Sequence, residues 1–116
     1  MGYYRMYTGD DGAAQWEEVD LQNMSCWQEG VDVTKAKFEY RPPGVFQDWH
    51  PAPQRQFVVI LSGNIEIGFE DGSKKTFGPT DVRLVEDTTG KGHTTIALGS
   101  EPCITMTVRL EDQGDE

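Results

Sequence analysis

Hydrophobic and polar positions alternate along much of this chain, in short stretches. Residues 35–41 carry apolar side chains at every second position, and so do residues 65–69 and 104–110. This period of two predicts half-buried β-strands, because successive side chains of a strand point to opposite faces. Residues 56–62 (QFVVILS) are apolar on both faces, which predicts a fully buried strand. We find no convincing amphipathic helix, so the pattern predicts an all-β protein.

Turn-forming residues separate these stretches. Asp71-Gly72, between residues 65–70 and 74–77, is a strong signal for a tight hairpin. The prolines of the segment 41–44 (RPPG) end the strand before them, because proline has no N–H to donate to a β-ladder. Several short strands joined by tight turns indicate a sandwich or a closed barrel. Closure is the more economical arrangement, because it hides the edge strands.

The chain of 116 residues is long enough for one domain with a hydrophobic core. We expect the barrel to span residues 33–111. Residues 1–32 are rich in aromatic side chains, which disordered segments usually lack. We therefore expect an N-terminal arm that packs on the barrel or on a dimer partner, with a short edge strand at residues 16–21. Residues 112–116 are predicted to form an acidic tail.

Charge and hydropathy exclude several classes of partner. The formal net charge is −10, whereas nucleic-acid binding needs clustered lysine and arginine. The same charge disfavours an anionic membrane surface, and no apolar run approaches the length that spans a bilayer. We expect a cytoplasmic protein that binds neither nucleic acid nor membranes.

The candidate chemistry centres on the only two histidines, His50 and His93. Each lies at the entrance of a predicted strand, where the mouth of a barrel places its binding groups. Gln56 begins the buried strand that follows His50. These three side chains are candidates for one pocket. The alternative is that each is a structural residue whose hydrogen bonds are satisfied within the protein.

The segment 44–63 resembles the first sequence motif of the cupin family, G-x5-H-x-H-x3,4-E-x6-G. Five residues separate Gly44 from His50, and six separate Gln56 from Gly63, so both outer spacings hold. The second histidine of the motif falls on Ala52, and its glutamate falls on Gln56.

A second stretch resembles the other cupin motif, G-x5-P-x-G-x2-H-x3-N, more loosely. Gly90-Lys91-Gly92-His93 keeps the spacing from glycine to histidine, while Thr88 and Ala97 replace the proline and the asparagine. The resemblance covers residues 33–110. It implies an all-β, single-domain double-stranded β-helix, which is the jelly-roll barrel of the cupins.

In the cupin family the histidines and the glutamate of these motifs bind a divalent metal. Carried over by position, the resemblance implies a metal site at His50, Gln56 and His93, with a gap at Ala52. Imidazole suits Zn, Fe or Ni, and a carbonyl oxygen suits Mn better. Without a carboxylate the site lacks the charge that offsets a dication, so we expect weaker binding. The alternative is a small anion bound without metal, and we predict no organic cofactor.

Four further residues are candidates for the pocket wall: Trp49, Ala52, Thr95 and Arg41. Thr95 shares a strand face with His93, and Arg41 is a cation that a substrate carboxylate would attract. Trp49 adjoins His50 and is equally compatible with the core. Three acidic residues lie on the loops beside the histidines: Asp48, Glu86 and Asp87. Each is a candidate base or ligand, although a loop carboxylate is usually only solvated.

Two main functions follow from these residues. The first is a metal-dependent enzyme of dioxygenase, isomerase or decarboxylase type that acts on a small organic molecule. The second is a small-molecule binding module without metal or catalysis, which the missing carboxylate favours. A third reading, a structural or partner-binding barrel, rests only on the aromatic arm. The resemblance also implies a homodimer, because cupins commonly pair through their sheets.

Overall fold

The computed structural model describes residues 2–111, and the predicted acidic tail at residues 112–116 lies outside them. The described chain is almost entirely β, as the alternating pattern predicts. Two short helical turns, η1 (Leu21–Asn23) and α1 (Ser25–Glu29), follow the first two strands. Among the described residues no helix is long and apolar enough to cross a membrane. The strands are β1 (Tyr3–Thr8), β2 (Ala14–Glu18), β3 (Val33–Arg41), β4 (Phe46–His50), β5 (Gln56–Ser62), β6 (Asn64–Gly68), β7 (Lys74–Phe77), β8 (Val82–Val85), β9 (His93–Leu98) and β10 (Cys103–Leu110).

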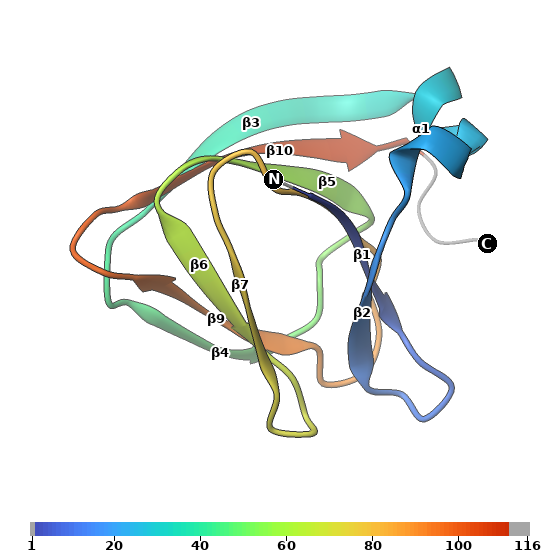
Figure 1. Ribbon diagram of the computed structural model, residues 1–116. Helices are drawn as coiled ribbons and strands as arrows, with labels where there is room; N and C mark the ends of the chain where they lie inside the picture. The colour runs from blue at the N-terminus through green and yellow to red at the C-terminus, as the bar shows by residue number, and fades with distance from the viewer. Residues whose placement is uncertain (1, 112–116) are drawn as a thin grey trace.

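The strands form two sheets that face each other across the interior of a jelly-roll barrel (Figure 1). The larger sheet has six strands in the order β2-β1-β8-β5-β10-β3, and the smaller has four in the order β4-β9-β6-β7. Neighbouring strands run antiparallel, except that β1 and β8 are parallel. The predicted all-β barrel is confirmed.

The hairpin between β6 and β7 forms where Asp71-Gly72 predicts it. The Gly72 N–H donates to the Phe69 carbonyl at 3.0 Å, and the Asp71 carboxylate accepts from the Ser73 N–H at 2.8 Å. Gly72 has φ +89°, a conformation that glycine adopts without steric cost. Local turn chemistry therefore fixes this connection.

The N-terminal segment lies on its own barrel and extends the larger sheet. β1 pairs with β8, and β2 forms the outer edge of the sheet beside β1. Met6 and Ala14 belong to the main hydrophobic core. The ring of Trp27, in α1, packs edge-on against Phe57 with a centroid distance of 5.1 Å. Residues 3–18 are thus an integral part of the sheet, and the predicted edge strand begins and ends slightly earlier than expected.

The main hydrophobic core lies between the two sheets. Its largest fully buried apolar side chains are Met6, Ile60, Ile65, Ile67 and Phe77. They come from both sheets, so the core joins the two layers. The cavity described below is lined mainly by polar side chains.

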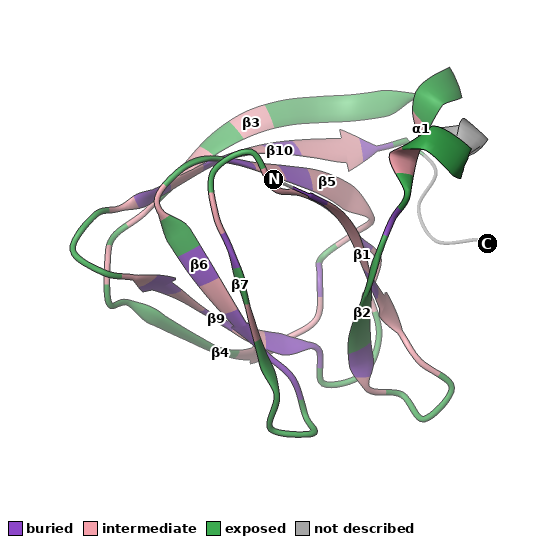
Figure 2. Cartoon of the chain, in the orientation of Figure 1, coloured by how far each residue is buried: buried purple, intermediate pink, exposed green. Residues whose placement is uncertain are grey.

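β3 and β10 turn their polar sides inward, which reverses the usual pattern. On β3, Lys37 and Glu39 are half-buried, whereas Phe38 and Tyr40 are 70% and 67% exposed. Figure 2 shows β3 largely exposed along its length. On β10, Thr105 and Thr107 are buried, whereas the alternating apolar residues Ile104, Met106 and Val108 are only half-buried. An apolar face normally turns to the core, so the alternation alone indicates the wrong inner face for these two strands.

Candidate functional site

A polar cavity of about 180 Å³ lies between the two sheets. The larger sheet contributes lining residues from β3, β5, β8 and β10, and the smaller contributes them from β4, β6 and β9. Both histidines and Gln56 line this cavity. The structure therefore brings together the three residues that the sequence proposes as metal ligands.

His50 and His93 are paired across neighbouring strands. They lie opposite each other where the last residue of β4 meets the first residue of β9, and their ring centroids are 4.7 Å apart. The register of β4 shifts between Gln47 and His50, so that both of these residues face the cavity although they are three positions apart. Such a bulge re-aims a side chain at a binding site.

The backbone beside the histidines is packed too closely for a side chain at residue 92. Gly92 precedes His93 and has φ +79°. A Cβ at this position would overlap the carbonyl group of His50. The glycine thus lets the His93 strand approach the end of β4, and this approach sets the spacing of the two imidazoles.

Each imidazole is held through its Nδ1 atom. His50 Nδ1 lies 2.8 Å from the carbonyl oxygen of Asp48, and His93 Nδ1 contacts a carboxylate oxygen of Asp87. A carbonyl or carboxylate oxygen accepts a hydrogen bond, so Nδ1 carries the proton in both rings. In its neutral form, each ring then keeps a lone pair on Nε2. Metal-binding histidines in proteins are held in this way by their outer neighbours.

Burial lowers the pKa of His50, since the charged imidazolium is less well solvated in the cavity. The Asp48 carbonyl and the negative charge of Asp87 act against this shift, and the positive charge of Arg41 adds to it. The net effect keeps His50 neutral to lower pH than a free histidine. Neutral imidazole is the form that binds a metal.

Gln56 presents a buried oxygen that lacks a partner. Within the described part of the chain, no group hydrogen-bonds to its Oε1 atom. A buried amide oxygen without a partner costs free energy. Exchange of the amide oxygen and nitrogen would leave a buried NH₂ end at the same place, so the position is short of a partner in either orientation. A metal ion or a ligand group would supply that partner.

Of the three acidic residues on the histidine loops, Asp87 is the one whose carboxylate contacts a site histidine. Its side chain is fully buried and holds His93, while its backbone carbonyl accepts from the Ala52 N–H at 2.9 Å. The Asp48 carboxylate accepts from the Trp49 N–H instead. Glu86 is held by two arginines, Arg5 at 2.5 Å and Arg55 at 2.7 Å. Asp87 is therefore a site residue, although its position on a loop does not distinguish it in the sequence from a solvated carboxylate.

Three of the four predicted wall residues line the cavity, namely Arg41, Ala52 and Thr95. Trp49 is not among the lining residues, and the Lys91 ammonium lies 4.4 Å from its ring centroid. The structure therefore does not place Trp49 in the cavity wall. The bulge in β4 turns His50 inward and leaves its neighbour outside.

Several lining residues were absent from the sequence-based hypothesis. They come from the polar faces of β3, β8 and β10: Lys37, Glu39, Arg83, Thr105, Thr107 and Arg109. The polar half of each alternating strand was visible in the sequence. These residues were missed because the apolar face of each strand was expected to turn inward.

The donor set fits a metal in part. Among residues 2–111, apart from the masked side chains at 25 and 26, no three His, Cys, Asp or Glu side chains cluster as a ligand set. The two imidazoles and the partnerless Gln56 oxygen supply three neutral donors instead. Two imidazoles with one oxygen are compatible with the borderline cations that histidine favours.

Solved structures with a similar fold identify the fold of this chain. The cupin 2 conserved barrel domain protein from Salinispora arenicola matches with a TM-score of 0.52 and 19% identity, over 69% of this chain and 61% of that one. The polyketide cyclase RemF from Streptomyces resistomycificus matches with a TM-score of 0.57 and 12% identity, over 95% of this chain and 75% of that one. The protein has the cupin fold. The sequence itself matches no protein-family model and no curated protein.

The cupin fold accounts for the position of the cavity. In this cupin barrel the two histidines enter from the smaller sheet, and Gln56 faces them from the larger sheet. This chain spans less than two thirds of the Salinispora arenicola protein. At these identities the likeness establishes the fold, and the function has to be argued from the site.

Proposed function

We propose that this cupin barrel binds a small organic molecule in its cavity, at a divalent cation held by His50, His93 and Gln56. One observation carries the proposal: both imidazoles have their Nδ1 atoms engaged and face the same cavity as a buried, partnerless amide oxygen. A cation bound there would supply Lewis-acid chemistry. The three protein donors leave positions open for a ligand, as catalytic metal sites do.

The chain's own residues have separate tasks in this proposal. Asp87 fixes the ring orientation and the tautomer of His93, and the Asp48 carbonyl does the same for His50. Ala52 lines the cavity at the position where the first cupin motif has its second histidine. Its small side chain leaves room for a ligand beside His50 and His93. The structural likeness to a polyketide cyclase is compatible with an organic ligand. Dioxygenase, isomerase and decarboxylase chemistry remain the candidate reaction types.

A second candidate is small-molecule binding without metal or catalysis. It is favoured because, in the described part of the chain, no three His, Cys, Asp or Glu side chains cluster as a ligand set around the two histidines. The histidines and Gln56 would then bind the ligand through hydrogen bonds. The two candidates differ in their response to added metal.

Calorimetric titration of tag-free, chelator-treated protein with Zn²⁺ tests the first candidate. We expect one ion per chain, and about 100-fold weaker binding in His50→Ala, because a site with three protein donors loses one of them. Gln56→Glu should bind Zn²⁺ more tightly than the wild type, because a carboxylate adds the charge that the site lacks.

Gln22→Glu is the matched control, because it adds the same charge at an exposed position outside the cavity. We expect its affinity to equal that of the wild type. If the wild type takes up no Zn²⁺ and Gln56→Glu brings no gain, the metal hypothesis is wrong and the second candidate stands.

We further propose that a second copy of this chain covers the outer face of β3. β3 is an edge strand of the larger sheet, and it exposes Phe38 and Tyr40 there. Exposed aromatic side chains on an unpaired edge are typical of protein interfaces. Light scattering should give twice the chain mass of 13.0 kDa, and Phe38→Glu should give a monomer. A monomeric wild type at concentrations near 100 times a typical micromolar Kd would contradict the proposal.

A further inference from the structure

The cavity contains a buried cation that the metal hypothesis does not use. Arg83, in the centre of β8, lines the cavity and is only 5% exposed. Its Nη1 atom lies 3.6 Å from the sulfur of Met6, and its Cζ atom lies 5.0 Å from the centroid of the Phe77 ring. Both neighbours are fully buried core residues. The guanidinium therefore lies between the apolar core and the polar cavity.

Among residues 2–111, Arg83 has no carboxylate partner to balance its charge. Within the described residues no acidic group lies within ion-pair distance of it, and its Nε atom, which is buried, makes no hydrogen bond. Burial lowers the pKa of Arg83 to about 10, and the more distant negative charge of Asp87 offsets this only in part. A buried charge without a partner is costly, and it is retained where a ligand supplies the partner.

Most of the other charges of the cavity have the same sign. Lys37, Arg41 and Arg109 line it together with Arg83. Glu39 is the acidic residue in the lining, and it lies 3.8 Å from the Lys37 ammonium. The Nε atom of Arg109 is likewise buried without a hydrogen-bond partner in the described part of the chain. Arg41 contributes to the lowered pKa of Arg83, because these two cations repel each other. A concentration of cations is unexpected in a chain whose net charge is −10.

We propose that the ligand of this cavity is a small organic carboxylate whose carboxylate group binds to Arg83, with Arg41 and Arg109 around it. This inference rests on the proposed function and names the class of its ligand. The planar fork of donors on a guanidinium matches the two oxygens of a carboxylate. The volume of about 180 Å³ is below that of usual ligand pockets, so the molecule is small.

Titration calorimetry with malonate, succinate and benzoate, and with their neutral amides, tests the inference. We expect saturable binding of at least one carboxylate and roughly 10- to 100-fold weaker binding of its amide, because charge-assisted hydrogen bonds are lost. Inorganic phosphate is included as a competing anion. If phosphate binds more tightly than every carboxylate, the assignment to a carboxylate is overturned.

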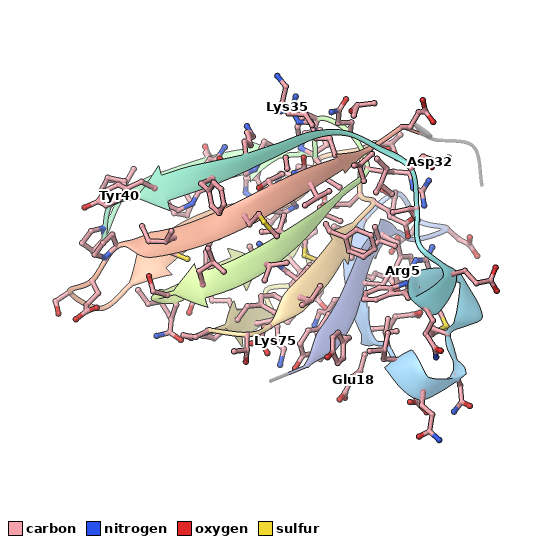
Figure 3. All side chains as sticks on the ribbon, turned by 90° about the horizontal axis from the view of Figure 1, so that it is seen from above. Arg5, Glu18, Asp32, Lys35, Tyr40 and Lys75 are labelled. Carbon is pink, nitrogen blue, oxygen red and sulfur yellow. The ribbon has the colours of Figure 1, made fainter. Side chains whose placement is uncertain are left out.

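Arg83→Gln and Arg83→Met test whether Arg83 itself binds the carboxylate or whether the net charge of the protein alone sets the affinity. Both variants should lower the affinity for the carboxylate roughly 10- to 100-fold. Lys35→Gln removes the same charge from an exposed residue of β3 that does not line the cavity, and it should leave the affinity unchanged (Figure 3). An equal loss in Lys35→Gln would overturn the role of Arg83.

Thermal unfolding without ligand distinguishes a binding residue from a structural one. Arg83→Met removes a buried, unpaired charge and should unfold at a higher temperature than the wild type. A lower unfolding temperature would mean that the guanidinium stabilises the core, which overturns the inference. If the carboxylates and their amides bind equally and Zn²⁺ binding is intact, this inference fails and the proposed function stands. If neither Zn²⁺ nor any of these compounds binds, both fail.

Discussion

Replacing Asp87 by asparagine will weaken Zn²⁺ binding roughly 10- to 100-fold, as the loss of an outer partner of a metal-binding histidine commonly does. The Asp87 carboxylate accepts the Nδ1 proton of His93 and is fully buried. An amide presents one oxygen and one NH₂ group, so it no longer enforces the tautomer that leaves Nε2 free. Calorimetric titration at constant pH measures the change.

Asp48→Asn is the matched control for this prediction. Asp48 also precedes a site histidine, but it is the backbone carbonyl that holds His50, and this group survives the substitution. We expect the Zn²⁺ affinity of Asp48→Asn to stay within about twofold of that of the wild type, as for a surface substitution. Equal losses in the two variants would mean that net negative charge, rather than the Asp87–His93 contact, supports the site.

Replacing Phe77 by alanine will lower the free energy of unfolding by about 3–5 kcal/mol. Phe77 is fully buried, and its ring packs edge-on against Tyr4 at a centroid distance of 5.1 Å. Truncation removes the buried ring and leaves a void, because the surrounding strands relax only in part. Urea denaturation followed by tryptophan fluorescence measures the loss.

Phe46→Ala makes the same change on an exposed position of β4. Phe46 is 56% exposed, so the expected loss is below about 1 kcal/mol. A loss in Phe77→Ala no larger than that in Phe46→Ala would show that the core does not lie where the structure places it. The comparison also gives the stability margin within which the site variants can be interpreted.

The fold and the positions of the two histidines were predictable because they depend on local spacing. The intervals from Gly44 to His50 and from Gln56 to Gly63 match a known motif, and Asp71-Gly72 fixes a hairpin by its own turn chemistry. Such signals act within a few residues. They hold whatever the rest of the chain does.

The inner faces of β3 and β10 were not predictable in the same way. Both strands alternate cleanly, and a two-residue period does not say which face turns inward. Here the polar face of each strand lines a cavity, while Phe38 and Tyr40 lie outside. That choice depends on contacts between strands that are far apart in the sequence, such as the hydrogen bond from Thr107 of β10 to Glu39 of β3.

Asp87, Arg83 and Trp49 show three further limits of the sequence. Asp87 looks like a solvated loop charge until the fold brings the loop against His93. Arg83 is a single cation in a short apolar strand, where nothing local distinguishes it from an exposed residue. Trp49 was assigned to the pocket by adjacency to His50, and the β4 bulge placed it outside.

Anomalous diffraction from a crystal soaked with Zn²⁺ tests the central claim most directly, because it locates the ion rather than inferring it. We predict one strong peak in the cavity, about 2.0–2.1 Å from Nε2 of both His50 and His93 and about 2.0–2.2 Å from the Gln56 amide oxygen. A peak only at surface carboxylates, with these three side chains free of metal, would show that the cavity is not a metal site.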